Sequence, residues 1–281
     1  MFGSHLSIAG GMHNALLEAE RLGFSTVQVF TKNQQQWKIK PLDPTAVDQW
    51  RLHCDRLKFS QTVSHDSYLI NLASPEEGLR RKSVELFVEE LRRCVVLKIP
   101  YLVTHPGAHM GQGEEAGLKR VAAALDEVHA AIPPGGVVTC LEITAGQGTS
   151  LGYKLEHLAQ IIALAKHPER LAVCFDTAHL FAAGYDFRGR KYQQFMKEVE
   201  STIGIKRIKV WHLNDSKKEL GSRVDRHEHI GRGTIGLEGF KPIVRDKAFA
   251  NVPKILETAK AKDEAGRDWD TVNLETLKSL M

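Results

Sequence analysis

Short apolar runs recur along this chain at regular intervals, and most of them end in a side chain that can bind a metal ion. Six such runs close on His, Asp or Glu, namely TVSH, YLVTH, VVTCLE, LAVCFD, IKVWH and PKILE. Their last residues are His65, His105, Glu142, Asp176, His212 and Glu257, which stand 34 to 45 residues apart. A strand, a helix and two loops take about that many residues, so the spacing predicts repeated βα units.

The chain as a whole contains eight strand-like runs, at about residues 2–8, 26–31, 61–65, 100–105, 137–142, 171–176, 208–213 and 253–257. Apolar residues at three-to-four spacing lie between them and predict amphipathic helices, among them 75–97, 117–132 and 155–165. Alternating strands and helices favour a parallel sheet. Eight repeats without a change in composition favour one (β/α)8 TIM barrel over residues 1–281, with an open doubly wound sheet as the alternative. In such a barrel the carboxyl ends of the strands converge on one face, where catalytic sites lie.

Three more potential ligands follow the same runs or lie in a long connection. His179 follows Asp176 within DTAH, and Asp225 and His227 form an Asp-x-His pair within the loop-like stretch 214–239. A connection this long in a compact domain is usually functional. Nine His, Asp and Glu side chains suit three zinc ions if one carboxylate is shared, and structural zinc sites more often use thiolates. The set therefore predicts a catalytic, multinuclear metal centre.

The remaining histidines are interpreted differently. We expect ordinary roles, in loops or helical patterns without partners, for His5, His13, His53, His129, His157 and His167. His109 and His229 lie close to ligands in the sequence, so we expect them to contact substrate or to orient a ligand.

The bulk composition is that of a globular protein without a membrane span. No run of about 18 uncharged apolar residues occurs, and the first residues, MFGSHLSIAGG, lack the pattern of a signal peptide. The four cysteines form no CxxC pair, which indicates buried thiols in a reducing cytoplasm. Cys140 and Cys174 each precede a ligand by two residues, so both should face the barrel interior. Three divalent ions would add six positive charges to a formal net charge of +4, which suits a polyanionic substrate.

Several longer motifs occur in a fixed order along the chain. They are HDSYLINL (65–72), HPG (105–107), LE-x-TAGQG (141–148), FDTAH with FAAGYD after it (175–186), HLNDSK (212–217), RVDRH followed by IGRG (223–233) and ILET (255–258). In these motifs the chain closely resembles the endonuclease IV family of abasic-site endonucleases over essentially its full length. The resemblance implies a monomeric TIM barrel with three Zn²⁺ ions, Mn²⁺ being possible at one or more sites.

The resemblance also implies a ligand assignment and a reaction. One metal is held by His65, His105 and Glu142, the second by Glu142, Asp176, His212 and Glu257, and the third by His179, Asp225 and His227. The reaction is hydrolysis of the phosphodiester 5′ to an abasic site in duplex DNA, leaving a 3′-hydroxyl and a 5′-deoxyribose phosphate, with trimming of blocked 3′ ends. A hydroxide shared by two metals would attack phosphorus in line. The expected catalytic residues are His105, Glu142 and Glu257.

DNA contacts are a further implication. An abasic nucleotide costs less to extrude than a normal one, and the protein must fill the gap with wedge side chains. Tyr68 and the loop 32–37 match positions that enter the duplex in the family. The expected DNA-binding residues are Asn33, Gln35, Tyr68, His109, Gln147, Lys217, Arg226 and Arg232. Two residues depart from the family pattern: Gln35 stands where well-known members carry an Arg wedge, and Ile143 follows the bridging Glu142 where Asn is common.

Two other functions agree with parts of this pattern. A sugar isomerase or epimerase on the same barrel would need Glu142, Asp176, His212 and Glu257 around one divalent metal. It would lack the other five ligands and the DNA loops. A metal-stabilised DNA-binding protein without catalysis would be expected to have lost at least one of the nine ligands, whereas all nine are present.

Overall fold

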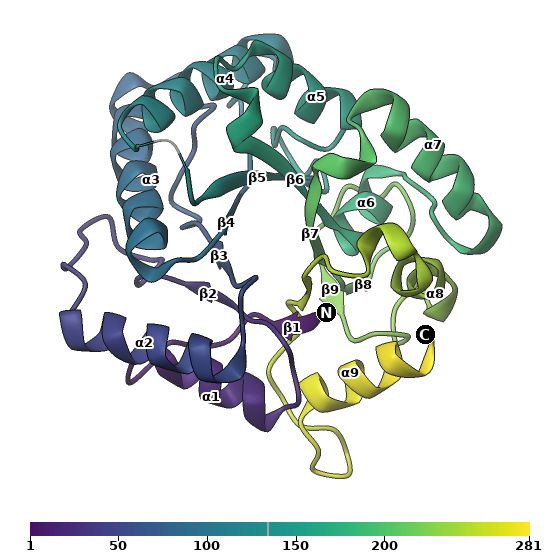
Figure 1. Cartoon of the computed structure of the whole chain (residues 1–281). Coiled ribbons are helices and arrows are strands. Elements are labelled where there is room, and N and C mark those ends of the chain that lie inside the picture. The colour runs from purple at the N-terminus through teal and green to yellow at the C-terminus, as the bar shows by residue number, and fades with distance from the viewer. Residues whose placement is uncertain (134) are drawn as a thin grey trace.

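The computed structural model describes residues 1–133 and 135–281. In this part of the chain eight strands form the main sheet, all paired in parallel: β1 (Phe2–Ser4), β2 (Gln28–Phe30), β3 (Val63–His65), β4 (Tyr101–Thr104), β5 (Val138–Glu142), β6 (Leu171–Asp176), β7 (Ile208–His212) and β10 (Lys254–Leu256). β1 pairs with β10 at one end of the strand order, and a bridge between His5 and Gln28 joins β1 to β2 at the other (Figure 1). The sheet therefore closes into the predicted barrel, and every predicted strand contains an observed one.

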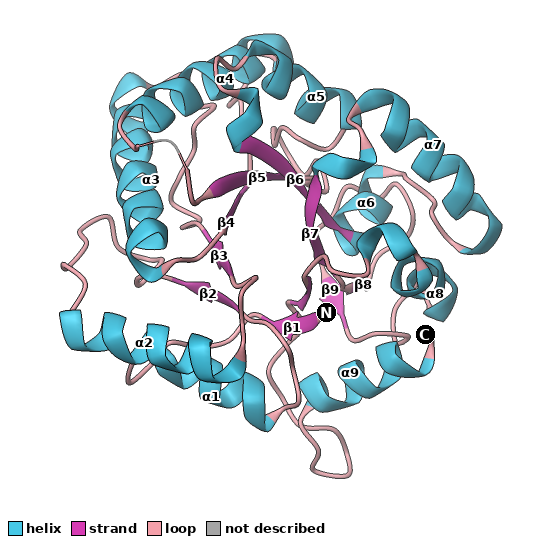
Figure 2. Ribbon diagram, viewed as in Figure 1, coloured by secondary structure: helices cyan, strands magenta, loops and turns pink. Residues whose placement is uncertain are grey.

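Helices surround the barrel on its outer side (Figure 2). The α-helices of the described residues are α1 (His13–Arg21), α2 (Pro44–Leu57), α3 (Glu77–Leu97), α4 (Glu114–Ala130), α5 (Leu155–Leu164), α6 (Thr177–Ala183), α7 (Tyr192–Thr202), α8 (Leu237–Arg245) and α9 (Trp269–Ser279). Short 3₁₀ turns occur at Pro168–Arg170, Gly189–Lys191, Ile205–Arg207 and Lys247–Phe249. The predicted helices 75–97, 117–132 and 155–165 correspond to α3, α4 and α5, with ends displaced by a few residues. Within the described residues, no helix has the length and apolar character needed to cross a membrane.

The barrel interior is a layer of small apolar side chains. It consists of Val63, Val103, Cys140, Ala172, Cys174, Val210 and Ile255, all buried. The prediction for Cys140 and Cys174 is confirmed, since both are buried free thiols in this layer. Side chains two residues apart on a strand face the same way. A potential metal ligand follows six of these interior residues by two positions, so the apolar layer forms the floor of the polar site above it.

The stretch 214–239 is more ordered than a loop. It contains a two-stranded antiparallel ladder of β8 (Asp215–Ser216) and β9 (His227–Glu228), and α8 already begins within it. The Asp215 carboxylate accepts hydrogen bonds from the backbone N–H groups of Ser216, Gly231 and Ile235 at 2.8 to 3.0 Å. Strands of two residues leave no periodic signal, so the sequence prediction of a simple loop was wrong here. The ladder holds His227 in a fixed place.

Candidate metal centre

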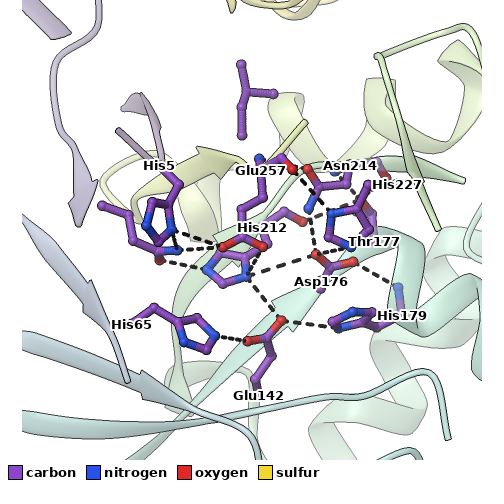
Figure 3. Close-up of polar contacts among 12 residues, drawn as sticks. His5, His65, Glu142, Asp176, Thr177, His179, His212, Asn214, His227 and Glu257 are labelled. Carbon is purple, nitrogen blue, oxygen red and sulfur yellow. Dashed lines mark hydrogen bonds and ion pairs between the residues drawn. The ribbon is translucent and has the colours of Figure 1, made fainter. Parts of the chain in front are cut away.

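All nine predicted ligands meet at the C-terminal mouth of the barrel, and seven of them are labelled in Figure 3. Six of them end barrel strands or follow them directly, and His179 lies in the first turn of α6. His227 is the first residue of β9, and Asp225 lies two residues before it. His179 is placed by local geometry, because its backbone N–H donates to the Asp176 carboxylate at 2.8 Å and so begins α6.

Glu142 lies at the centre of the cluster, where its carboxylate faces four imidazoles, and it is fully buried. Its Oε2 lies 3.1 Å from Nε2 of His65 and 3.2 Å from Nε2 of His105. Its Oε1 lies 3.1 Å from Nδ1 of both His179 and His212. A carboxylate oxygen only accepts hydrogen bonds, so each facing imidazole nitrogen must either carry a proton or share a cation with the oxygen.

The first group consists of His65, His105 and Glu142, whose ligand atoms lie within 4.8 Å of one another. His65 donates Nδ1–H to the carbonyl of Asp66 at 2.9 Å, which leaves the Nε2 lone pair directed at Glu142. In the neutral ring two acceptors then face each other, and either a proton or a metal cation between them resolves this arrangement. Burial opposes the charged imidazole, but Asp66 and Glu142 together raise the pKa of His65 well above its ordinary value.

The second group consists of Glu142, Asp176, His212 and Glu257. Nδ1 of His212 lies 3.2 Å from Oε2 of Glu257. The Asn214 amide fixes two members, because it donates to Asp176 Oδ2 at 2.6 Å and accepts from the Glu257 backbone N–H at 2.8 Å. Burial alone would raise the pKa of Glu257, yet the neighbouring His212 holds it well below the usual range.

The third group joins His179, Asp225 and His227. Asp225 lies between the two imidazoles, with Oδ2 3.1 Å from Nε2 of His179 and Oδ1 3.2 Å from Nε2 of His227. Asp176 also reaches this group, since its Oδ2 lies 3.7 Å from Nε2 of His227. Burial favours neutral His227, but Asp176 and Asp225 raise its pKa to about 9.

The donor set fits divalent metal ions. Among the described residues, the buried Nε2 of His227 has no hydrogen-bond partner although it points at Asp225, as expected of a metal ligand. Imidazole nitrogen and carboxylate oxygen are ligands that zinc accepts. Sγ of Cys174 also lies near the ligand atoms of Glu142 and His212. Burial raises the pKa of the Cys174 thiol to about 12, in keeping with its place among the apolar side chains of the barrel interior.

A pocket of about 480 Å³ lies beside the cluster. Among its lining residues are the ligands His105, His179 and Asp225 together with Tyr68, Gln147 and Arg226. The side chain of Tyr68 is 66% exposed, and its ring centroid lies 5.8 Å from that of His65. Gln147 accepts a hydrogen bond from the backbone N–H of Asp225 at 3.2 Å. Three of the predicted DNA-binding residues therefore share one pocket with the metal ligands.

The other predicted DNA-binding residues do not line this pocket in the described structure. Asn33 and Gln35 are exposed in one turn, where the Gln35 backbone N–H donates to Asn33 Oδ1 at 2.9 Å. His109 Nδ1 accepts from the Gly113 backbone N–H, and the exposed Lys217 lies 3.9 Å from Glu228. The exposed Arg232 lies 5.7 Å from the centroid of the Trp269 ring, on which His229 stacks at 4.0 Å.

Some residues of the centre were missed in the sequence. The prediction that His5 has no partner is wrong, because its Nδ1 lies 3.6 Å from Oε1 of Glu257. Gln28 was also missed, although it contacts His5, His212 and Glu257. The sequence did carry a signal for it, since Gln28 is a polar residue at an inward-facing position of the strand-like run TVQVF. His129 and His157 also have partners, Thr139 and Glu114, outside the centre. Ile143 contributes through its carbonyl, which accepts from Nδ1 of His179 at 2.9 Å, whereas its side chain is buried in the core.

Comparison with known proteins decides the family. The family model for xylose isomerase-like TIM barrels matches residues 16–279. A probable endonuclease 4 from Chloroflexus aurantiacus is 50% identical over 281 residues, which are 100% of this chain and 98% of that protein. The chain belongs to the endonuclease IV family.

Solved structures agree with this membership. Endonuclease IV from Thermus thermophilus is 34% identical and superposes with a TM-score of 0.86, covering 99% of this chain and 98% of that one. A D-psicose 3-epimerase from Clostridium cellulolyticum covers 99% of this chain and 98% of its own with a TM-score of 0.69, but at 13% identity. The likeness to the epimerase shows the shared barrel alone, whereas the likeness to endonuclease IV extends to the sequence.

Proposed function

We propose that this endonuclease IV family member is a DNA-repair enzyme that hydrolyses the phosphodiester 5′ to abasic sites in duplex DNA. The products are a 3′-hydroxyl and a 5′-deoxyribose phosphate. The observation that carries the proposal is a cluster of eight His, Asp and Glu side chains, joined by Asp225 through His179 and His227, beside a pocket that an exposed tyrosine also lines. The enzyme acts as a cytoplasmic monomer in this proposal, in keeping with its buried free thiols.

Three zinc ions are the proposed cofactors, with Mn²⁺ able to replace zinc at one or more sites. His65, His105 and Glu142 hold the first, Glu142, Asp176, His212 and Glu257 the second, and His179, Asp225 and His227 the third. Bound metals of this kind lower the pKa of water and neutralise a phosphodiester in the transition state. His105, Glu142 and Glu257 are the proposed catalytic residues, since Glu142 lies at the junction of two groups and His105 opens onto the pocket.

The protein side chains then bind and orient the DNA. The pocket beside the cluster receives the extruded abasic sugar, whose missing base lowers the cost of leaving the stack. Tyr68 stands at its rim with two-thirds of its side chain exposed, so it is placed to fill the space that the nucleotide leaves. Arg226 lines the same pocket and supplies positive charge for the phosphate. Asn33, Gln35, His109, Gln147, Lys217 and Arg232 complete the proposed DNA-contacting set.

Trimming of blocked 3′ ends is part of the same proposal. A blocked 3′ end presents its phosphate ester at the end of a strand, so no internal nucleotide has to leave the base stack to expose it. The pocket and the cluster can therefore receive it without further groups, and phosphatase or phosphodiesterase chemistry at such ends requires the same charge neutralisation.

The deciding experiment is a nicking assay on a duplex with one tetrahydrofuran abasic analogue, in EDTA and without added magnesium. This analogue cannot undergo β-elimination, so cleavage 5′ to it with a 3′-hydroxyl product requires hydrolysis. The same duplex without the analogue serves as the control. Absence of cleavage after zinc is restored would refute the proposal and favour a sugar epimerase, for which the quartet of Glu142, Asp176, His212 and Glu257 suffices.

A further inference from the structure

One buried amide reaches the metal centre from the barrel interior. Gln28 is fully buried and pairs in register with Val63, a member of the apolar interior layer. An amide in such surroundings is costly unless its hydrogen bonds are satisfied. Gln28 satisfies them with three imidazole or carboxylate partners: Glu257 Oε1 at 2.6 Å, His5 Nδ1 at 3.0 Å and His212 Nε2 at 2.8 Å. Two of these partners belong to the second group of ligands.

The carboxylate determines which way this amide is turned. The oxygen of Glu257 can only accept, so the group that faces it must be the NH₂ of Gln28. The carbonyl oxygen of Gln28 consequently faces His212 and accepts from its Nε2–H. Neutral His212, the form that binds a metal, is then the tautomer whose Nδ1 carries the lone pair, and this Nδ1 is the atom directed at Glu142 and Glu257 (Figure 3).

His212 differs from its neighbours in how it is oriented. Three histidines of the centre use Nδ1–H to reach a backbone carbonyl and direct Nε2 inward, namely His65 to Asp66, His179 to Ile143 and His227 to Glu257. His212 directs Nδ1 inward, and the acceptor of its Nε2–H is a side chain. Its tautomer therefore depends on one residue that a substitution can remove.

Barrel closure supplies the third partner. The bridge that joins β1 to β2 pairs His5 with Gln28. Because the amide NH₂ faces His5, the Nδ1 atom of His5 is the acceptor of that hydrogen bond. The His5 ring also contacts Phe30, with ring centroids 4.2 Å apart, which restrains it. His5 thus holds the NH₂ group of the Gln28 amide, whereas His212 meets its oxygen.

We propose that Gln28, held by His5, is a positioning residue that sets the tautomer of His212 and the orientation of Glu257, and so the metal affinity of the second group. This inference rests on the proposed metal-dependent function, and it adds Gln28 and His5 to the residues proposed for the metal centre. Groups that orient metal ligands typically change metal affinity by about 10- to 100-fold when they are removed.

Metal release from the zinc-loaded protein tests the proposal. Gln28→Leu keeps the volume but removes both the acceptor for His212 and the donor to Glu257. Gln28→Glu keeps the acceptor and places a carboxylate against Glu257. In both variants we expect one zinc ion per chain to transfer to a chromophoric chelator about 10- to 100-fold more readily than in the wild type. His5→Phe should show a smaller change in the same direction.

A matched control removes a glutamine amide elsewhere. Gln61 precedes β3, and its side chain accepts a hydrogen bond from the Tyr101 hydroxyl, so Gln61→Leu should release zinc as the wild type does. Thermal unfolding of the metal-free forms establishes that each variant folds. Zinc content and release unchanged in both Gln28 variants would overturn this inference alone. A wild-type protein that takes up no zinc would overturn the proposed function together with it.

Nuclear magnetic resonance of the wild-type protein gives a test that needs no variant. In zinc-loaded protein with ¹⁵N-labelled histidine, long-range ¹H–¹⁵N correlation reports which ring nitrogen of His212 carries the proton. We expect Nε2–H with Nδ1 bound to metal. A proton on Nδ1 of His212 would contradict the proposed role of Gln28, whatever the variants show.

Discussion

At the scale of single residues, the centre depends on side chains that have no close substitute. Glu257 meets Gln28 with one oxygen and His212 with the other, at 2.6 and 3.2 Å. An amide at this position would lose the negative charge and turn one acceptor into a donor. Asp225 likewise meets two imidazoles with its two oxygens. Substitutions that preserve shape but not charge are therefore the informative ones.

Glu257→Gln is expected to abolish cleavage of abasic duplex, with a rate loss of more than about 100-fold, because it weakens charge neutralisation at the second group. Binding of the same duplex should be retained, since the pocket and its rim are unchanged. Nicking and mobility-shift assays measure the two effects. Glu127→Gln, on the exposed side of α4, is the matched control. Near-normal cleavage by Glu257→Gln would remove Glu257 from the site.

His179→Ala is expected to lower the zinc content by about one ion per chain after dialysis, because it removes one of three ligands of the third group. Mass spectrometry of the acid-digested protein measures zinc directly. His167→Ala changes an exposed histidine whose partner is Glu169, so it should leave the zinc content as it is. Three ions still bound to His179→Ala would contradict the assignment of the third group.

At the scale of elements, the loop between β2 and α2 is held by hydrogen bonds to α3 and to the residues after β3. Arg93 of α3 donates to the carbonyls of Thr31 and Lys40, at 2.6 to 3.0 Å. Ser67 Oγ donates to the Gln34 carbonyl at 2.6 Å, directly before Tyr68. None of these anchors uses the Gln35 side chain, which is exposed. The loop therefore keeps its backbone shape whichever side chain stands at position 35.

Gln35→Arg is expected to tighten binding of abasic duplex by roughly tenfold, since a hydrogen bond from a charged group contributes about 1.5 kcal/mol. A mobility-shift titration measures the change. Gln35→Met is the control, because it has a similar length without the charge. If Gln35→Arg binds no more tightly than the wild type, this loop does not enter the DNA as proposed.

At the scale of the whole molecule, the metal centre and the barrel support each other. Its candidate ligands come from segments spread between β3 and the residue after β10, so the proposed ions would connect distant parts of the chain. Without metal, the cluster places four carboxylates around one small volume. Ligands that bind only the folded state raise its stability by mass action.

Prolonged chelation is therefore expected to lower Tm by several degrees, because each kcal/mol of lost stability shifts Tm by roughly 2–4 °C in proteins of about this size. Differential scanning calorimetry before and after dialysis against a strong chelator measures the change, with metal content checked on the same samples. Re-addition of zinc should restore the original Tm. An unchanged Tm after verified metal removal would show that the centre does not contribute to stability.

The fold and the gathering of the nine candidate ligands at one mouth of the barrel were largely predictable because both leave local signals. An interior residue and its ligand stand two positions apart on one strand, as Cys140 and Glu142 do, and this alternation is visible in the sequence. The ladder of β8 and β9 left no such signal, because its strands have two residues each. His5 was misjudged for a related reason: its partner Glu257 lies at the other end of the chain.

The sequence by itself determined the number of βα units, the strand positions and the kinds of side chain at the strand ends, since these follow from short-range periodicity. The tertiary structure alone decided which atom of each side chain faces the cluster. His212 presents Nδ1 to the cluster while its Nε2 meets Gln28, a residue of β2 that the bridge to His5 joins to the other edge of the sheet. Contacts between segments far apart in the chain depend on how the sheet closes, and no local pattern in the sequence encodes that geometry.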